Sequence, residues 1–259
     1  MSNDFSFLRP ISFSTCSYLK RHPGERAKMV SEAISTWSDL LDLPFAEKYF
    51  LDDQSHDFGA LKLLVSGNLL GKFTHAEYCT IRHSPHSNFG IVRGLELATT
   101  PYIMHLDDDV YVSGTADQCK EAITLAIDVM ENDQTIMGFN LLNLDPSFHG
   151  ADWLQDEPYR KHSGLFHPKK YFGAAASVIR RELLDRIPFV QLMVWGDKQP
   201  DIWESLVTKS PKEFIAGTQN SPFQVKRTSY FFSATNEIST RVRFQYLVKA
   251  RWRRLLGKG

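Results

Sequence analysis

The chain has 259 residues, of which 42% are hydrophobic and 23% charged, and its formal net charge at pH 7 is zero. It is long enough to bury a full core, and its composition is that of a soluble globular protein. The balanced charge does not point to any particular partner, and no apolar run approaches the length of a membrane span.

The cysteines and the N-terminal segment indicate in which cellular compartment the protein is expected. Cys16, Cys79 and Cys119 are widely spaced and form no CxxC pattern, which argues against a disulfide framework or a zinc site. The opening segment MSNDFSFLRP lacks the basic and apolar regions of a signal peptide. We therefore expect a cytoplasmic protein, with peripheral attachment to the inner face of the cell membrane as an alternative.

Strands and helices alternate in the first part of the chain. Apolar residues at helical spacing predict a helix that Pro44 ends, and the strand after it runs into Asp52 and Asp53. In chain order the predicted elements are a strand over 11–18, a helix over 25–43, a strand over 47–55, a helical stretch over 57–70 and a strand over 77–81.

The alternation continues through the middle of the chain. The segment 88–100 predicts a helix that leads into a strand, PYIMHL. Thr115 and Gln118 predict a capping box at the start of the next helix. One face of that helix carries Cys119, Ala122, Ile123, Ala126, Ile127 and Met130. The later elements are a strand over 135–144, an irregular loop over 145–170, a strand and short helix over 171–189, and a helix over 195–207.

This order predicts an α/β fold whose parallel or mixed sheet is covered by helices on both faces. In such sheets, ligands bind at the carboxyl ends of the strands. Both acid clusters, Asp52–Asp53 and Asp107–Asp109, come at predicted strand ends. Their shared position is the first indication of a functional site.

The three acids Asp107–Asp109 lack a counter-charge nearby in the sequence. They repel one another, and no lysine or arginine lies within ten positions on either side. They form either a solvated turn or a site for Mg²⁺ or Mn²⁺, which prefer oxygen ligands and often take only one or two from the protein. We favour the metal site, because the acids directly follow a strand of buried character and a second acid pair ends another strand.

Four segments in order, FLDDQS, GLELATTPYIMHLDDDV, FGAAASVIRRELLDRI and PDIWESLV, resemble the motifs of GT-A fold glycosyltransferases, especially family 2. The resemblance covers residues 10–215 approximately. It implies a single Rossmann-like GT-A domain over 1–235, with a mixed, mainly parallel central sheet flanked by helices. The nucleotide-sugar-binding half would be 10–110 and the acceptor half 111–235.

The resemblance also implies a chemistry. Such enzymes transfer a sugar from a nucleotide diphosphate donor, with Mn²⁺ or Mg²⁺ bridging the diphosphate to the acids. Asp109 would ligate the metal, and Asp107 or Asp108 would face the ribose and a metal-bound water, with Asp107 as the second candidate ligand. Asp53 would accept a hydrogen bond from the base, with Asp52 beside it. The residues near the base and ribose would be Ser14, Thr15, Cys16 and Ser17.

One family feature is missing before the metal-binding strand. Many members have an Arg-Asn pair where this chain has Ile91 and Val92. Arg82 or Arg93 would then contact the diphosphate instead, or each is a surface charge.

In inverting members of the family, a late acidic motif supplies the base that takes the proton from the acceptor hydroxyl. The segment QPDIWESL matches it, with Pro200 where the family usually has Glu, so Asp201 is the candidate base. Asp197 is the alternative, because Pro200 can shift the alignment. Asp201 is also placed to cap a helix that starts at Ile202, and one side chain can do both.

The C-terminal segment differs from the rest of the chain. Residues 241–259 contain seven basic residues and no acidic one, and apolar residues recur there at helical spacing. The tail over 236–259 therefore predicts a basic amphipathic helix that either binds a membrane surface or packs on the domain. Nucleic acid is not an expected partner, because the rest of the chain lacks a basic stripe.

We therefore expect a metal-dependent, inverting glycosyltransferase that uses a nucleotide-sugar donor, with a UDP-sugar favoured, and a glycan or glycolipid acceptor. A metal-dependent nucleotidyltransferase is one alternative, although STCSYLKRHPGE lacks the Gly-rich phosphate loop that such enzymes normally need. A catalytically inactive nucleotide-sugar-binding scaffold is the other. The departures at Pro200 and Ile91–Val92 leave the scaffold open.

Overall fold

The computed structural model describes most of the chain up to Val225. The described residues are 6–19, 24–53, 55–78, 88–143, 154–160, 162, 164–169, 175–186, 206, 209–216 and 220–225. Several predictions lie outside these residues, namely the roles of Arg82, Asp197 and Asp201 and the tail over 236–259. The predicted helix over 195–207 also lies outside them, apart from Leu206.

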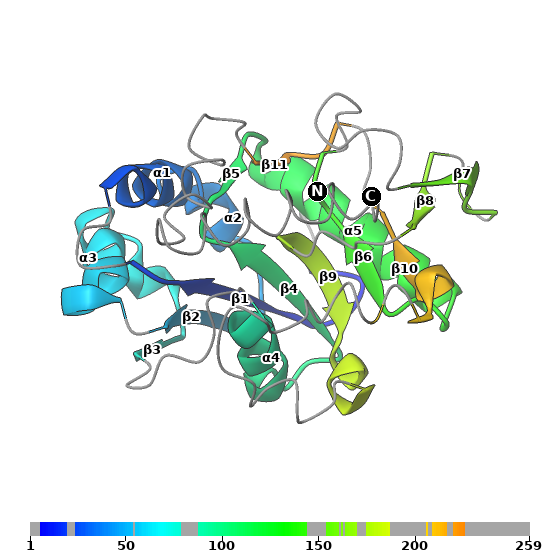
Figure 1. Ribbon diagram of the computed structural model, residues 1–259, viewed down its shortest axis with the longest axis horizontal. Coiled ribbons are helices and arrows are strands. Elements are labelled where there is room, and N and C mark those ends of the chain that lie inside the picture. The colour runs from blue at the N-terminus through cyan, green and yellow to red at the C-terminus, as the bar shows by residue number, and fades with distance from the viewer. Residues whose placement is uncertain are drawn as a thin grey trace, which may run out of the picture.

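A seven-stranded sheet forms the centre of the fold (Figure 1). Its order is β10-β6-β9-β4-β1-β2-β3, and β9 runs antiparallel to β4 and β6 while the other neighbours are parallel. The expectation of a mixed, mainly parallel sheet is confirmed. The strands are β1 Ile11–Ser17, β2 Lys48–Asp52, β3 His75–Tyr78, β4 Tyr102–Asp107, β6 Gly138–Asn140, β9 Ala176–Arg180 and β10 Phe214–Ile215.

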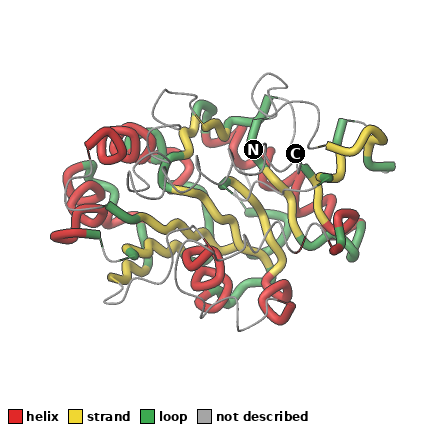
Figure 2. The backbone as a smooth tube through the Cα atoms, viewed as in Figure 1, coloured by secondary structure: helices red, strands yellow, loops and turns green. Residues whose placement is uncertain are grey.

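Helices cover both faces of this sheet, as Figure 2 shows. On one face, α1 (Gly24–Ile34), α2 (Ser38–Leu41), α3 (Gly59–Ser66) and α5 (Ala116–Asn132) enclose the larger hydrophobic core. On the other face, α4 (Asn88–Leu97) and the 3₁₀ helix η4 (Arg181–Arg186) enclose a smaller core. Shorter 3₁₀ helices are η1 His56–Phe58, η2 Leu70–Lys72 and η5 Pro211–Glu213.

Side-chain alternation along β4 shows how the sheet divides the two cores. Tyr102, Met104 and Leu106 belong to the larger core, and Ile103 belongs to the smaller one. Because successive side chains of a strand point to opposite faces, His105 and Asp107 lie on the same face as Ile103. The strand therefore delivers Asp107, its last residue, to the face that carries the smaller core.

The predicted capping box at the start of α5 is confirmed. Thr115 Oγ1 accepts a hydrogen bond from the Gln118 backbone N–H (3.3 Å), and Gln118 Oε1 accepts one from the Thr115 N–H (2.9 Å). Of the predicted apolar face, Ala122 is partly buried and the other members are fully buried: Cys119, Ile123, Ala126, Ile127 and Met130.

The single helix predicted over 25–43 is wrong, because the chain breaks between α1 and α2. The Ser35 and Thr36 hydroxyls donate to the carbonyl oxygens of Glu32 and Ala33, three residues earlier, at 2.7 and 2.6 Å. Such bonds compete with the regular helical ladder. Trp37 then fills the break, fully buried, with its indole N–H donating to the Val110 carbonyl at 2.8 Å.

Five short strands were not expected from the sequence, and one of them is β10 (Phe214–Ile215). β5 (Val110–Val112) pairs antiparallel with β11 (Phe223–Val225), directly after the acid triplet. β7 (Leu154–Pro158) and β8 (Phe166–Pro168) pair within the segment predicted to be irregular. Strands of two to five residues carry little periodicity, and the partner of β5 lies more than a hundred residues away. Conversely, the strand predicted over 135–144 shrinks to β6.

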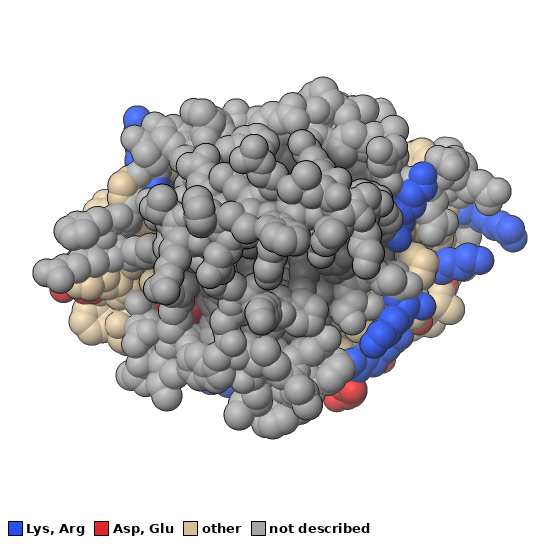
Figure 3. Space-filling view, viewed as in Figure 1, with Lys and Arg blue, Asp and Glu red and all other residues tan. Residues whose placement is uncertain are grey.

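One part of the described surface is rich in basic side chains. Lys and Arg side chains gather at the right-hand end of Figure 3, over the β7–β8 hairpin, β10 and η5, with a few acids between them. Among the described helices, none combines the length and apolarity needed to cross a bilayer.

The contact between α4 and β1 generates a stability prediction. A Cβ added at Gly94 would lie 2.4 Å from Ser14 Oγ and 2.8 Å from Ser14 Cβ. Although alanine favours helix formation over glycine by ~1 kcal/mol, Gly94→Ala should destabilise the fold by ~1–3 kcal/mol because α4 must move off the sheet. Chemical denaturation measures the change.

Gly71→Ala is the matched control, since nothing lies within 4 Å of a Cβ added there. It should leave the free energy of unfolding unchanged to within about 0.5 kcal/mol. A Gly94→Ala variant as stable as the parent would contradict the close helix–sheet packing.

Candidate active site

Three neighbouring strands end at the same edge of the sheet and bring the two acid clusters together. In the parallel β1–β2 pair Ser17 lies opposite Asp52, and in the parallel β1–β4 pair Cys16 lies opposite Asp107. The end of β1 therefore lies between Asp52–Asp53 on one side and Asp107–Asp109 on the other. Each cluster lies at a strand end, as the sequence predicts, and the strand order makes the two clusters neighbours.

Asp52 ties the loop after β2 to the loop after β1. Its side chain is fully buried, and Oδ1 accepts the Ser55 N–H at 2.7 Å while Ser55 Oγ accepts the Leu19 N–H at 2.8 Å. Burial raises the pKa of Asp52, despite those hydrogen bonds. Its Oδ2 is buried with no hydrogen-bond partner. The neighbouring Asp53 is 3% exposed, and its N–H donates to the Ser17 carbonyl at 2.9 Å.

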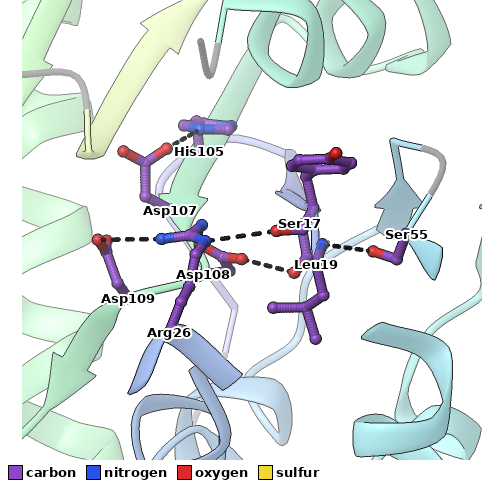
Figure 4. Close-up of polar contacts among 9 residues, drawn as sticks. Ser17, Leu19, Arg26, Ser55, His105, Asp107, Asp108 and Asp109 are labelled. Carbon is purple, nitrogen blue, oxygen red and sulfur yellow. Dashed lines mark hydrogen bonds and ion pairs between the residues drawn. The ribbon is translucent and has the colours of Figure 1, made fainter. Parts of the chain in front are cut away.

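Asp108 points into the fold, as Figure 4 shows. Its Oδ1 accepts a hydrogen bond from Arg26 Nη2 at 2.7 Å, and its Oδ2 accepts one from Ser17 Oγ at 2.5 Å. The residue is only 3% exposed. Burial raises the pKa of Asp108, and the Arg26 guanidinium opposes this by favouring the ionised form.

Asp107 and Asp109 remain more open than Asp108. Asp107 Oδ1 lies 2.9 Å from Nε2 of the buried His105, and the Asp107 N–H donates to the Ala175 carbonyl at 2.6 Å. The side chains of Asp107 and Asp109 are 24% and 19% exposed. Asp109 Oδ2 lies 3.9 Å from Arg26 Nη1. Burial, followed by repulsion from Asp108 and Asp107, raises the pKa of Asp109 to about 7.

Comparison with solved structures identifies the fold. The chain matches a Pyrobaculum calidifontis mannosyltransferase in complex with GDP-Man and Mn²⁺ (TM-score 0.52, 14% identity, 88% of this chain and 60% of that one). It also matches GalNAc-T7 with UDP, GalNAc and Mn²⁺, with a TM-score of 0.54 and 13% identity over 84% of this chain and 43% of that one. A third match is residues 1–349 of TarS from S. aureus, with a TM-score of 0.50 and 12% identity over 84% of this chain and 60% of that one. The chain has the GT-A fold.

This likeness is one of structure, at a level of identity where sequence similarity is faint. No family model matches the sequence, and no curated protein does so either. The chain spans 43 to 60% of the length of the three structures. The GT-A fold expected from the four sequence segments is confirmed.

The acid edge of this GT-A domain suits a divalent cation with few protein ligands. Within the triplet, Arg26 forms ion pairs with Asp108 and Asp109, so Asp107–Asp109 and Arg26 together carry a formal charge of −3 + 1 = −2. Asp109 and Asp107 offer partly exposed oxygens, whereas Asp108 is occupied. Within the described residues no group of three or more His, Cys, Asp or Glu converges to hold a metal. Mg²⁺ or Mn²⁺ would therefore take one or two carboxylates here and its remaining ligands from water and phosphate.

The other residues that the sequence predicts for the donor site differ in their exposure at this edge. Ser14 and Thr15 are fully buried and contribute no surface to it. Cys16 is partly exposed and lies opposite Asp107. Arg93 forms ion pairs with Glu77 (3.0 Å) and Glu96 (3.1 Å), an arrangement that favours the alternative of a surface charge.

The sequence analysis missed Arg26, whose 82-residue separation from Asp108 hides the contact. A topological signal was present, however. The chain leaves β1 at its carboxyl end, so the first turn of the next helix begins at the acid edge, and Arg26 is the third residue of α1. The missing counter-charge of the triplet is thus supplied in part by the protein.

The raised pKa of Asp109 predicts how stability depends on pH. In the unfolded chain this carboxyl titrates near 4. As the pH rises from about 4 to about 7, the unfolded chain therefore loses this proton before the folded chain does, and the stability of the fold decreases. Without metal at about pH 8, Asp109→Asn should therefore raise the melting temperature by roughly 2–4 °C per kcal/mol gained. The gain should vanish near pH 4.

Thermal unfolding in EDTA across this pH range measures the effect. Asp128→Asn, on the exposed face of α5, is the control and should show no comparable trend. A lower melting temperature for Asp109→Asn at about pH 8 would refute the assignment of a destabilising carboxylate.

Proposed function

We propose that this chain is a glycosyltransferase that moves a sugar from a nucleotide diphosphate-sugar to a hydroxyl of a glycan or glycolipid. The observation that carries the proposal is the convergence of Ser17, Asp52–Asp53 and Asp107–Asp109 at one edge of a GT-A fold, where Arg26 offsets only part of the negative charge. The donor complexes of the similar structures, with GDP-Man or UDP and with Mn²⁺, support it.

The chain's own residues would hold the donor by its two polar ends. Asp53 would accept a hydrogen bond from the base, and Cys16 at the end of β1 would line the ribose, because Ser17 is buried and donates its hydroxyl to Asp108. Asp109 and Asp107 would hold the Mn²⁺ or Mg²⁺ ion. When bound, that ion would neutralise charge on the diphosphate leaving group. Asp107 is the better candidate to face the ribose, because both oxygens of Asp108 are engaged inside the fold.

For inversion, a base must take the proton of the attacking acceptor hydroxyl on the face of the sugar opposite the leaving group. Asp201 is the proposed base and Asp197 the alternative. We also propose that residues 10–110 bind the donor and 111–235 the acceptor. A UDP-sugar is the favoured donor, and the tail over 236–259 is a proposed membrane contact at the cytoplasmic face.

The first test is donor binding followed by turnover. UDP-, GDP-, CDP- and dTDP-sugars are screened by thermal shift with and without Mn²⁺, and one donor should raise the melting temperature by several degrees because it binds only the folded state. With that donor, Asp109→Ala should lower turnover at least about 100-fold without unfolding the chain.

Asp128→Asn again serves as the control, with turnover equal to the parent. No thermal shift with any donor would count against the function as a whole. Binding of a donor without hydrolysis or transfer in Mn²⁺ would favour the inactive scaffold. Nucleotidyl transfer to an acceptor would favour the nucleotidyltransferase.

The role of the base is tested separately. Asp201→Asn should lower the rate of transfer by about 100-fold or more while leaving the donor-induced thermal shift intact, since general-base catalysis contributes about 10²–10⁴-fold. Kinetics at saturating donor measure the effect. An unchanged rate would move the role to Asp197, where Asp197→Asn is measured in the same assay.

A further inference from the structure

Arg26 reaches from the first turn of α1 into the acid edge (Figure 4). Its guanidinium donates from Nη2 to Asp108 Oδ1 at 2.7 Å and from Nε to the Tyr18 carbonyl at 3.3 Å. Its Nη1 lies 3.9 Å from Asp109 Oδ2. The guanidinium is therefore held between the residue that follows β1 and two consecutive acids of the β4–β5 turn.

Both oxygens of Asp108 are engaged by the protein. Arg26 binds one, Ser17 binds the other, and the residue is 3% exposed. Of the three acids, Asp108 is thus the one whose carboxylate lies inside the fold. Asp107 and Asp109 keep about a fifth to a quarter of their side chains exposed, at 24% and 19%.

We propose that Arg26 is a positioning residue that withholds Asp108 from the metal and so sets the strength of the cation site. With Arg26 present, the site has two available carboxylates and a formal charge of −3 + 1 = −2. The cation then binds weakly by itself and firmly only when the donor diphosphate adds its own oxygens. This inference rests on the metal site of the proposed function.

Two substitutions that each replace a charged side chain with a neutral amide change the charge of the site in opposite directions. Arg26→Gln leaves a charge of −3 and frees an oxygen of Asp108, so the cation should bind more tightly. Asp108→Asn leaves −2 + 1 = −1 and an unpaired guanidinium near Asp109, so the cation should bind more weakly. The double variant restores −2 without the ion pair. Its affinity should equal that of the parent, because Asp108 contributes no ligand.

A direct ligand role for Asp108 gives a different result. Asp108→Asn would then remove a metal–oxygen bond, and restoring the charge through Arg26→Gln would not bring that bond back. The double variant separates the two cases, and it is also the variant expected to fold. Removing both partners of a buried ion pair is tolerated much better than removing one.

The experiment measures binding of Mn²⁺ alone, without donor, by electron paramagnetic resonance of the free ion. Arg26→Gln should tighten binding at least about tenfold and Asp108→Asn should weaken it similarly, as expected for a unit charge a few ångströms away. The double variant should lie within about threefold of the parent. Arg9→Gln, which removes an exposed arginine 3.5 Å from Glu131, is the control and should change nothing.

A double variant that binds Mn²⁺ as weakly as Asp108→Asn, or an Arg26→Gln that binds no more tightly than the parent, overturns the proposal. If Arg26→Gln fails to fold, Asp108→Asn and the double variant decide the question. If neither the parent nor Arg26→Gln binds Mn²⁺, the proposal is also overturned.

The failure of this inference can be told apart from the failure of the proposed function. If the variants show the expected pattern of Mn²⁺ binding in a protein that neither binds nor turns over any nucleotide-sugar, this inference is supported and the proposed function is refuted. Turnover with a double variant that binds Mn²⁺ as weakly as Asp108→Asn does the reverse.

Discussion

The parallel pairing of β1 with β2 on one side and β4 on the other is the constraint from which the site follows. Parallel ladders place the carboxyl ends of adjacent strands about 5 Å apart, so acids that end β2 and β4 must share an edge with the end of β1. Five carboxylates, Asp52–Asp53 and Asp107–Asp109, gather there. Repulsion among them has to be offset by hydrogen bonds, by a cation, or by both.

The protein offsets the repulsion unequally. Asp52 and Asp108 are built into the fold through Ser55, Ser17 and Arg26, and both are buried. Asp109 is stabilised less by such contacts. Its pKa is raised to about 7, which shows that its ionised form is unfavourable at this position. Residues that destabilise the fold at an edge where ligands bind are characteristic of functional sites, because selection for activity keeps them. The acid edge therefore has one part that is buried in the fold, at Asp52 and Asp108, and one part that stays partly exposed, at Asp107 and Asp109.

The strand–helix alternation, the placement of both acid clusters at strand ends and the capping box at Thr115 could all be predicted, because each depends on residues close together in the sequence. The Arg26–Asp108 contact was missed, because the two residues are 82 positions apart and meet only when the start of α1 is placed beside the end of β4. The break before Trp37 was missed because the helical spacing of apolar residues continues across it. The spacing gives no sign that the Ser35 and Thr36 hydroxyls bind backbone carbonyls there. The prediction could name three acids, but only the packing of β1 and α1 distinguishes Asp108 from its neighbours.

The pairing of β5 with β11 has a consequence for how the chain acquires its site. Ser113 donates a backbone hydrogen bond to the Pro222 carbonyl at 2.8 Å, and Val112 pairs with Phe223, so the segment just after the acids is held by residues about 110 positions later. Contacts of such separation close slowly, because the intervening chain must first be ordered. During synthesis, the sheet from β1 to β4 can assemble early. The acid turn gains its last support only once residue 225 has emerged, so this edge is a late-maturing part of the fold.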